Sequence, residues 1–281
     1  MTIAIGMLYD KGVLMCADSL VTTGTLGSFQ SKILGYRVDG ADVVFALSGN
    51  VDLAESAWQL CRPVLLKHAG KRRTAQEIAD SLRPLLAREY QEQVTGPGFV
   101  NSQYDYSFLI AIRPIGAKAK IYTTYQKTLK ESTTGRECIG AGGDLAKFLL
   151  TWIQPPHLSA ERLADILGYV VGTLKRQMPG VIGGNNLIIS LGDDGEILFY
   201  TRSDLQLIEQ YAPVYEFDSY NLLWKFLDTS IDESKFDEAL AAISQTVRYS
   251  RSQYKQKRDT TWSVPPDEAQ QAIIDLRTTK R

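Results

Sequence analysis

The sequence predicts an α+β fold, a four-layer αββα sandwich of two antiparallel sheets flanked by helix pairs, with a mostly helical C-terminal extension. Two observations predict it. Segments with the β-branched, alternating composition of strands come in groups, and pairs of segments with helical periodicity separate those groups. The order strands, helix pair, strands, helix pair, strands favours antiparallel sheets, each with helices on one face, over an alternating parallel fold.

The first strands come as two hairpins. Residues 2–9 and 13–18 are short apolar runs, and the turn-forming residues 10–12 separate them. Residues 32–38 and 43–48 repeat this arrangement around a second turn. Four strands within the first fifty residues indicate an antiparallel sheet, because only antiparallel neighbours can be joined by such short turns.

Helical periodicity then replaces alternation. Apolar residues at spacings of three and four predict a helix over 51–65, and a second stripe predicts another over 75–86. Thr74 and Glu77 have the spacing of a capping box at the start of the second helix. Pro84 is expected to kink or shorten that helix.

The same succession repeats in the middle of the chain. The predicted strands and helices, in order, are strands 106–112 and 119–125, helices 143–154 and 159–176, and strands 185–191 and 196–201. The glycines at 140–143 precede a helix and could cradle a phosphate. Their spacing matches no phosphate-binding motif and Asp144 would repel a phosphate, so a tight strand-to-helix turn is favoured.

The end of the chain is predicted to be separate from the sheets. We assign residues 1–211 to the domain that holds them and residues 212–281 to a helical extension, packed on that domain or used in subunit contacts. One apolar stripe of this extension consists of Phe236, Leu240, Ile243 and Val247. Residues 248–259 interleave tyrosines with basic residues, a pattern that could bind nucleic acid or a partner. Because the chain has no overall basic charge, a solvated helix face or a subunit contact is favoured.

Composition excludes several classes of function. The chain has 281 residues and a formal net charge of -1, so no overall charge attracts nucleic acid or an anionic membrane. Its apolar runs are shorter than the roughly 20 residues that cross a bilayer. The N-terminus lacks the basic and apolar regions of a signal peptide, so a cytoplasmic protein is expected.

Cysteine and histidine give no basis for a metal or other cofactor. Cys16, Cys61 and Cys138 are far apart and show no metal-ligand spacing, and the chain has only His68 and His157. Serine–histidine and histidine–metal chemistry are therefore poor candidates. Any catalytic base has to come from another group.

Thr2 supplies such a group if Met1 is removed. A threonine at the mature N-terminus carries its own base, because its α-amine can take the proton of the hydroxyl. The pKa of an α-amine is about 7.7–8.0, and a neighbouring cation lowers it. Asp18 ends the second strand of the first hairpin and should return beside Thr2, and Lys32 begins the third strand, where it can pair with Asp18.

These residues resemble the proteasome-type N-terminal-nucleophile (Ntn) hydrolases, which include proteasome β-subunits, the bacterial heat-shock-locus V peptidase and Anbu. The resemblance lies in TIAIG, the strand ending CADSLVTTG, then SKI and ALSGN, and it extends over roughly residues 2–201. The resemblance implies that Thr2 is the nucleophile and that Asp18, Ser19 and Lys32 are catalytic. It also implies that Gly49 binds the oxyanion and that the backbone of Thr22 pairs with the substrate. Val21 and Leu47 are then the residues that line the substrate pocket.

The resemblance also implies an activity. It predicts a threonine peptidase that cleaves peptides or unfolded proteins inside a homo-oligomeric ring, with an ATP-dependent unfoldase as a possible partner. Because Val21 and Leu47 are apolar, an apolar side chain is expected before the cleaved bond.

Three positions depart from the family's pattern and leave alternatives open. The family places a serine where this chain has Ala141, and an aspartate and a serine where it has Pro179 and Ile182. Such supporting groups usually affect rate. A proteasome-fold scaffold with weak or lost activity is therefore the alternative, and an amidase that acts on small molecules is a third interpretation.

Overall fold

The computed structural model describes residues 2–23, 26–68, 70–96, 105–152, 158–200, 208, 209, 213, 232–261 and 273–275. The chain divides into two compact units, Met1–Thr201 with Pro266–Arg281, and Arg202–Pro265. The predicted division at residue 211 differs from this one, because the end of the chain returns to the first unit. All sequence-predicted site residues belong to the first unit.

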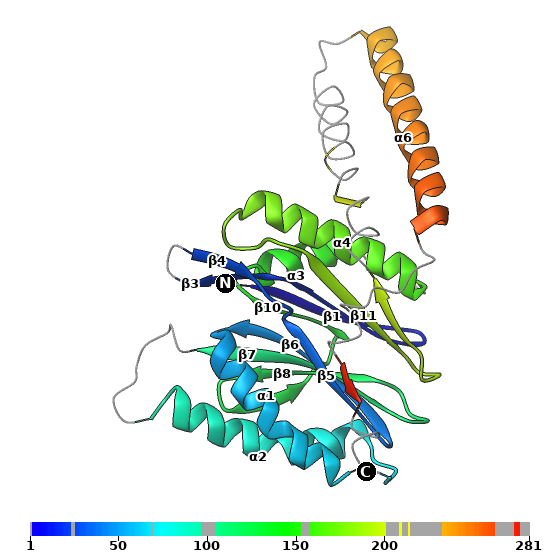
Figure 1. Ribbon diagram of the computed structural model, residues 1–281. Helices are drawn as coiled ribbons and strands as arrows, with labels where there is room; N and C mark the ends of the chain where they lie inside the picture. Colours follow the sequence, from blue (N-terminus) through cyan, green and yellow to red (C-terminus); the bar gives the residue numbers. More distant parts are fainter. Residues whose placement is uncertain are drawn as a thin grey trace. The chain divides into compact units, whose positions relative to one another are not determined.

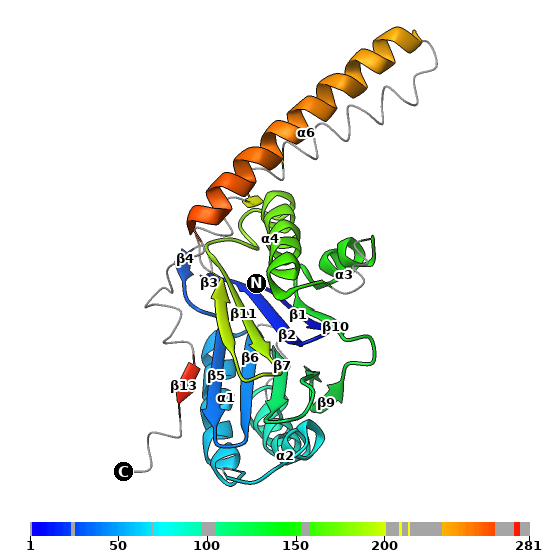
Figure 2. The same cartoon turned by 90° about the vertical axis from the view of Figure 1, so that its right-hand side faces the viewer.

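One sheet of the first unit has six strands. In spatial order they are β13 (Ile273–Asp275), β5 (Ile33–Val38), β6 (Ala41–Gly49), β7 (Tyr106–Pro114), β8 (Lys120–Tyr125) and β9 (Thr128–Glu131). All neighbours are antiparallel except β13, which runs parallel to β5 and pairs Ile274 with Tyr36 (Figure 2). This short strand lies in the extension that the sequence predicted to be mostly helical, and no strand was predicted there.

A second, fully antiparallel sheet of the same unit has five strands. In spatial order they are β10 (Arg136–Gly140), β1 (Ile3–Tyr9), β2 (Gly12–Asp18), β11 (Asn186–Gly192) and β12 (Ile197–Tyr200). The predicted hairpin of the first two strands is confirmed. A two-stranded ribbon, β3 (Leu20–Thr23) and β4 (Leu26–Phe29), follows β2.

Four helices accompany these sheets: α1 (Val51–Leu66), α2 (Ala75–Gln93), α3 (Gly143–Trp152) and α4 (Ala160–Gln177). The predicted capping box of α2 is present, because the Thr74 N–H donates to Glu77 Oε2 at 2.8 Å and the Glu77 N–H donates to Thr74 Oγ1 at 3.2 Å. Of the two effects expected of Pro84, a kink or a shorter helix, the shortening does not occur, because α2 continues to Gln93. Buried residues on both sides of Pro84, Leu82 and Leu86, outweigh the one backbone hydrogen bond that a proline removes.

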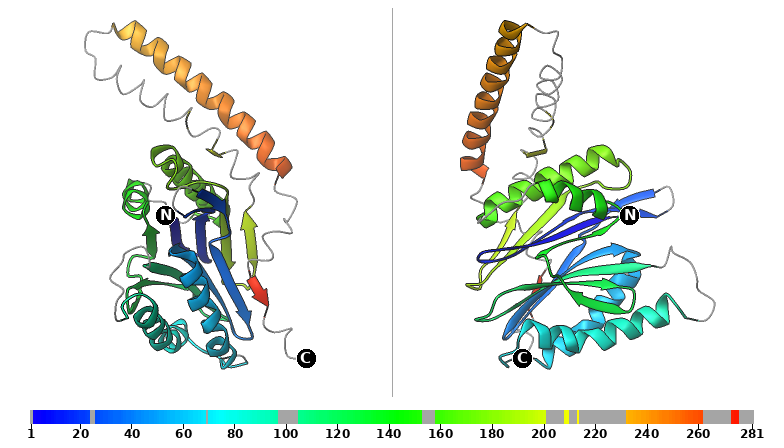
Figure 3. Two further views of the ribbon diagram at one scale, coloured as in Figure 1. Left: turned by 60° about the vertical axis from the view of Figure 1, so that its left-hand side comes forward. Right: turned by 180° about the vertical axis from the view of Figure 1, so that it is seen from behind.

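Each helix pair packs on one sheet (Figures 1 and 3). Helix α1 contacts β6 and β7, and α2 contacts β7 and β9, whereas α3 and α4 contact β1, and α3 also contacts β10. Strand β6 is buried on both faces: Phe45 and Leu47 belong to the apolar cluster under α1 and α2, and Val44 and Ala46 belong to a second cluster. This second cluster also contains Met15 and Ala17 of β2, so the two sheets share it.

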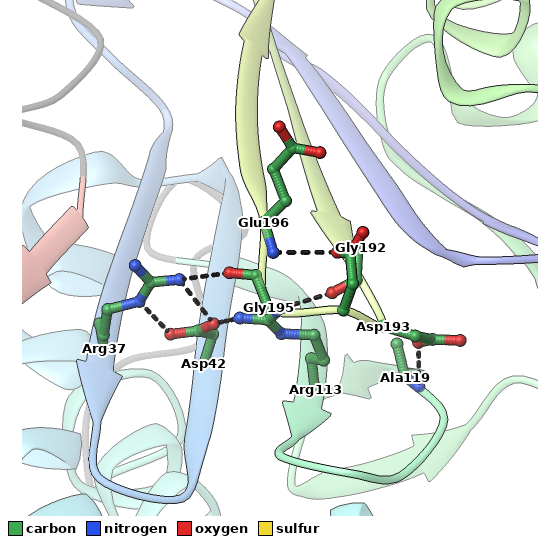
Figure 4. Close-up of polar contacts among 9 residues, drawn as sticks. Arg37, Asp42, Arg113, Ala119, Gly192, Asp193, Gly195 and Glu196 are labelled. Carbon is green, nitrogen blue, oxygen red and sulfur yellow. Dashed lines mark hydrogen bonds and ion pairs between the residues drawn. The ribbon is translucent and has the colours of Figure 1, made fainter.

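A cluster of charges with a buried Asp42–Arg113 pair and a partly exposed Arg37 connects the two sheets (Figure 4). Asp42 forms ion pairs with Arg113 and with Arg37, whose Nε lies 2.8 Å from Asp42 Oδ1. Arg113 donates to the Gly192 carbonyl, and Arg37 Nη2 donates to the Gly195 carbonyl at 3.0 Å. The two arginines of the six-stranded sheet therefore hold the turn between β11 and β12 of the other sheet.

The second unit contains helix α6 (Glu233–Thr261). Phe236 and Ile243 of the predicted stripe are half-buried, and Ala239 between them is buried. Leu240, which lies on the same face of the helix as Phe236 and Ile243, is 44% exposed. Tyr249 is 65% exposed, as a solvated face predicts.

None of the described helices is long and apolar enough to span a membrane.

Candidate active site

The site is built around the carboxylate of Asp18, which has no exposed surface. The β1–β2 hairpin pairs Ala4 with Ala17, so the residues just beyond this pair come together at the open end of the hairpin. There the Ile3 N–H donates to Asp18 Oδ1 at 3.2 Å. Asp18 Oδ2 accepts the Gly183 N–H at 3.1 Å. The chain segment directly after Thr2 is thus bonded to Asp18.

Lys32 is the charged partner of Asp18. It lies just before β5, and its own carbonyl accepts the Leu47 N–H at 2.8 Å, which fixes its backbone against β6. Lys32 Nζ lies 2.8 Å from Asp18 Oδ1 and also donates to the Leu20 carbonyl. Burial lowers the pKa of Lys32 below its usual value, and the charge of Asp18 offsets part of this effect. The ammonium therefore gives up its proton more readily than an exposed lysine does.

Thr2 lies immediately before β1. With Met1 still attached, only 1% of the surface of Thr2 is exposed. Its carbonyl approaches Gly140 closely: a Cβ built on Gly140 would lie 2.1 Å from the Thr2 oxygen and 2.9 Å from Ser48 Oγ. Gly140 also has a φ of +93°, a conformation that favours glycine. The strand-to-helix turn predicted around 140–143 thus brings Thr2 beside the end of β6.

Gly49 ends β6 directly after Ser48. Its φ is +91°, and a Cβ on it would lie 2.2 Å from the Asp105 carbonyl oxygen. The next residue, Asn50, donates its N–H to that same carbonyl at 2.9 Å and caps α1. The packing therefore requires glycine here whatever the chemical role of its N–H.

The loop after Ile182, which the sequence reasoning connected with the site only through the missing polar groups at Pro179 and Ile182, contacts Asp18 and Ser19 through its backbone. The Gly183 carbonyl accepts the N–H groups of Ser19 at 3.3 Å and Leu20 at 3.1 Å. Ser19 Oγ accepts the Asn185 N–H at 2.8 Å. The Ser19 hydroxyl is thus engaged with the loop. The glycine pair before a strand was the one sequence signal that could have revealed these contacts.

Lys175 holds the same loop from the other side. It lies in the last turn of α4, and its Nζ donates to the Gly184 carbonyl at 2.7 Å. Gly184 has a φ of +70°, and a Cβ on it would collide with Ser19 Oγ and the ring of Phe29. No sequence motif marks this lysine, because basic residues are common in the last turn of any helix.

The predicted substrate-binding residues lie on β3 and β6. Within the described part of the chain β3 pairs only with β4, where Thr22 lies opposite Gly27, so its other edge carries no strand. Val21 packs against the α1–α2 cluster and stays partly exposed. Leu47 is completely buried in that cluster. Val21 is therefore the member of the predicted pocket pair that solvent reaches.

The three departures from the family's pattern occupy different environments. Ala141 and Pro179 are exposed, and Ile182 is 2% exposed. A Cβ built on Gly142 would lie 2.5 Å from Ile182 Cδ1 and 3.5 Å from Ile3 Cδ1, so these apolar side chains fill the space over Gly142. Apolar packing stands where the resemblance leads one to expect a polar support.

Comparison with known proteins relates the fold to solved structures only. No protein-family model and no curated protein matches the sequence. The Anbu (Gly-1) mutant from Hyphomicrobium sp. strain MC1 matches with a TM-score of 0.68 at 12% identity, over 80% of this chain and 99% of that one.

Two further solved structures give the same result. Anbu (ancestral beta-subunit) from Yersinia bercovieri has a TM-score of 0.66 at 14% identity, over 78% of this chain and 97% of that one. The helical assembly of the Anbu complex from Pseudomonas aeruginosa has a TM-score of 0.63 at 14% identity, over 80% of this chain and 96% of that one. The chain therefore has the mixed α and β fold, with antiparallel sheets, of the proteasome-like Anbu structures.

Proposed function

We propose that the chain is a threonine-type peptidase of the proteasome-type Ntn class, in which removal of Met1 exposes Thr2 as the nucleophile. One observation carries the proposal. The fully buried Asp18–Lys32 pair lies at the N-terminus, and Asp18 also accepts the N–H of Ile3, the residue next to Thr2. Burying two charges costs free energy, and here the buried cation lies beside the N-terminus, where N-terminal threonine chemistry uses a nearby cation.

The reaction uses groups of this chain alone. Thr2 Oγ attacks the carbonyl carbon of a peptide bond while the free α-amine of Thr2 takes the hydroxyl proton. That amine then gives the proton to the departing amine, and the acyl group remains as an ester on Thr2. Water, deprotonated by the same α-amine, attacks the ester carbonyl carbon, and the resulting ammonium returns the proton to Thr2 Oγ as the bond to the acyl group breaks and the acid leaves. Lys32 lowers the pKa of the α-amine by its charge, and Asp18 keeps Lys32 in place.

Other residues bind the substrate in this proposal. The Gly49 N–H donates to the oxyanion of the tetrahedral intermediate. The free edge of β3 at Thr22 pairs with an extended peptide, as sheet edges do. Val21 contributes exposed apolar surface near the side chain before the cleaved bond, and the buried Leu47 belongs to the apolar cluster on which Val21 packs. A fluorogenic peptide panel is therefore expected to show fastest cleavage after apolar residues, and fastest cleavage after acidic or basic residues would contradict this assignment.

Assembly and architecture belong to the same proposal. We infer that the two sheets and their helix pairs form a four-layer αββα sandwich. We also infer a cytoplasmic homo-oligomer that encloses the active sites. It acts on peptides or unfolded proteins, with or without an unfoldase. The helical assembly described for the Pseudomonas aeruginosa protein supports oligomer formation.

A scaffold with a decayed site is the second candidate. The apolar contact of Ile182 and the loss of polar groups at Ala141 and Pro179 favour it.

Intact-mass spectrometry separates the two candidates. The native protein is expected to lack Met1 and to gain the mass of one β-lactone inhibitor per chain. Thr2→Ala removes the hydroxyl but keeps a small second residue, so it should lose Met1 and gain no adduct. Thr151→Ala, on the exposed surface of α3, should react like the wild type. Retained Met1 in the native protein would contradict the peptidase and support the scaffold.

A further inference from the structure

We propose that Lys175 is a positioning residue of the active site, which acts on Asp18 and Ser19 through the loop 183–185. The inference rests on the proposed function for its kinetic consequence. It concerns a residue outside the set Thr2, Asp18 and Lys32, and it assigns to α4 the support that Pro179 and Ile182 do not give.

The loop 183–185 faces the site with two donors. The Gly183 N–H donates to Asp18 Oδ2 at 3.1 Å, and the Asn185 N–H donates to Ser19 Oγ at 2.8 Å. The first bond reaches the carboxylate that pairs with Lys32. The orientation of these two N–H groups therefore decides how Asp18 and Ser19 are held.

Lys175 fixes the orientation of one of these groups, the Asn185 N–H, through one peptide unit, and it holds the loop that carries the other. The Gly184 carbonyl and the Asn185 N–H belong to the same planar peptide unit, so they turn together. Lys175 Nζ holds the oxygen of this unit at 2.7 Å, and Ser19 Oγ holds its N–H. A rotation of the peptide plane would break both bonds at once. The unit is thus clamped between α4 and the residue after Asp18.

The backbone of the loop needs such a clamp. Gly184 has a φ of +70°, and glycine visits many conformations in the absence of restraints. An ammonium donor makes a stronger hydrogen bond to a carbonyl than a neutral donor does. Lys175 is only half-exposed and reaches the loop from the last turn of α4, so the helix supplies a rigid base for it.

Two variants of Lys175 and one control test the inference. Lys175→Met removes the ammonium and keeps an unbranched chain, and Lys175→Arg keeps a cationic donor. Lys147→Met is the control, because Lys147 is an exposed lysine of α3 whose nearest acidic partner, Glu137, lies 4.0 Å away. The measurements are the kcat and KM for a fluorogenic peptide, the rate of β-lactone addition to Thr2, and hydrogen exchange at the Asn185 amide.

We expect Lys175→Met to lower kcat and the rate of β-lactone addition about 10- to 100-fold, with KM changed less than about 2-fold. Exchange of the Asn185 amide should become at least about 10-fold faster. Lys175→Arg should retain most of the wild-type reaction rates and most of the protection of the Asn185 amide. Lys147→Met should match the wild type. Wild-type kinetics in Lys175→Met, or a KM change alone, would overturn the inference. If Lys175→Met does not fold, Lys175→Gln, which keeps a neutral donor, is measured in its place and is expected to show smaller losses of the same kind.

The two proposals fail in different ways. If the wild type neither cleaves peptides nor reacts with the β-lactone, the proposed function is wrong, and hydrogen exchange alone judges the role of Lys175. Unchanged exchange at Asn185 in Lys175→Met then overturns the positioning role, and faster exchange supports it.

Discussion

The protein buries two ion pairs, one at each end of β5, and they differ in the kind of cation. Lys32 precedes β5 and pairs with Asp18, whereas Arg37 near the other end of β5 shares Asp42 with Arg113. The first pair bonds backbone groups around the N-terminus, and the second bonds backbone carbonyls of the β11–β12 turn (Figure 4).

The difference teaches which pair can do chemistry. A guanidinium stays protonated at every accessible pH and offers several donors in a fixed plane, which suits a permanent connection between two sheets. A buried lysine is a point charge whose pKa moves with its surroundings, and burial lowers that of Lys32. Equal burial therefore serves stability at one end of β5 and, in our proposal, reactivity at the other.

The largest contrast is expected from the same substitution at the two carboxylates. Asp18→Asn removes the charge that holds Lys32 and should slow acylation of Thr2 by about 10²- to 10⁴-fold. Asp42→Asn lies at the other end of β5 and should leave that rate within about 2-fold of the wild type. The rate of β-lactone addition, followed by intact mass, measures both. Equal loss in the two variants would remove the distinction between the pairs.

Stability should respond most strongly at Asp42. Asp42→Ala leaves the buried guanidinium of Arg113 without its carboxylate, and removal of one partner of a buried pair costs about 3–5 kcal/mol in the free energy of unfolding. Urea unfolding followed by circular dichroism measures this loss. A change below about 1 kcal/mol would mean that the arginines do not hold the sheets together.

The pH dependence of stability should distinguish lysine from arginine. Because the pKa of Lys32 is lowered from 10.5, the unfolded chain holds a proton that the folded chain has lost between the lowered value and 10.5. In that window this group makes the free energy of unfolding rise with pH, by at most about 1.4 kcal/mol per pH unit.

Lys32→Met should lose this rise, and Arg113→Met should keep it. Urea unfolding across the alkaline range provides the comparison. Identical slopes in the wild type and Lys32→Met would show that the pKa of Lys32 does not differ between the folded and unfolded chain.

The smallest effect is expected at an exposed pair. Lys120 and Glu131 lie 2.7 Å apart on β8 and β9 with side chains 42% and 38% exposed. Lys120→Ala should change the free energy of unfolding by no more than about 1 kcal/mol, because solvent and salt screen such pairs. A loss as large as that of Asp42→Ala would show that burial does not distinguish the ion pairs at the two ends of β5 from an exposed ion pair.

Local patterns made much of the fold and half of the site predictable. Alternation predicted the β1–β2 hairpin, the spacing of Thr74 and Glu77 predicted the start of α2, and the hairpin placed Asp18 within reach of the N-terminus. Asp18 and Lys32 are only 14 residues apart, so short-range reasoning could bring them together.

Contacts between distant segments could not be predicted in this way. The Gly183 N–H reaches Asp18 across 165 residues, and only the pairing of β11 with β2 brings them together. Strand β13 has three residues and depends on β5 for its partners, so no pattern of its own reveals it. Leu47 looked like a pocket residue, but both faces of β6 are covered and its side chain is enclosed.

The most direct test maps the site of β-lactone addition in three proteins by tandem mass spectrometry of the N-terminal peptide. The wild type and Arg113→Lys are expected to lose Met1 and to carry the adduct on Thr2. Lys32→Arg is expected to lose Met1 and remain unmodified, because the larger, planar guanidinium does not fit the fully buried site of the Lys32 ammonium beside Asp18. A wild-type protein that loses Met1 without reacting at Thr2, or equal labelling in Lys32→Arg, would contradict the account.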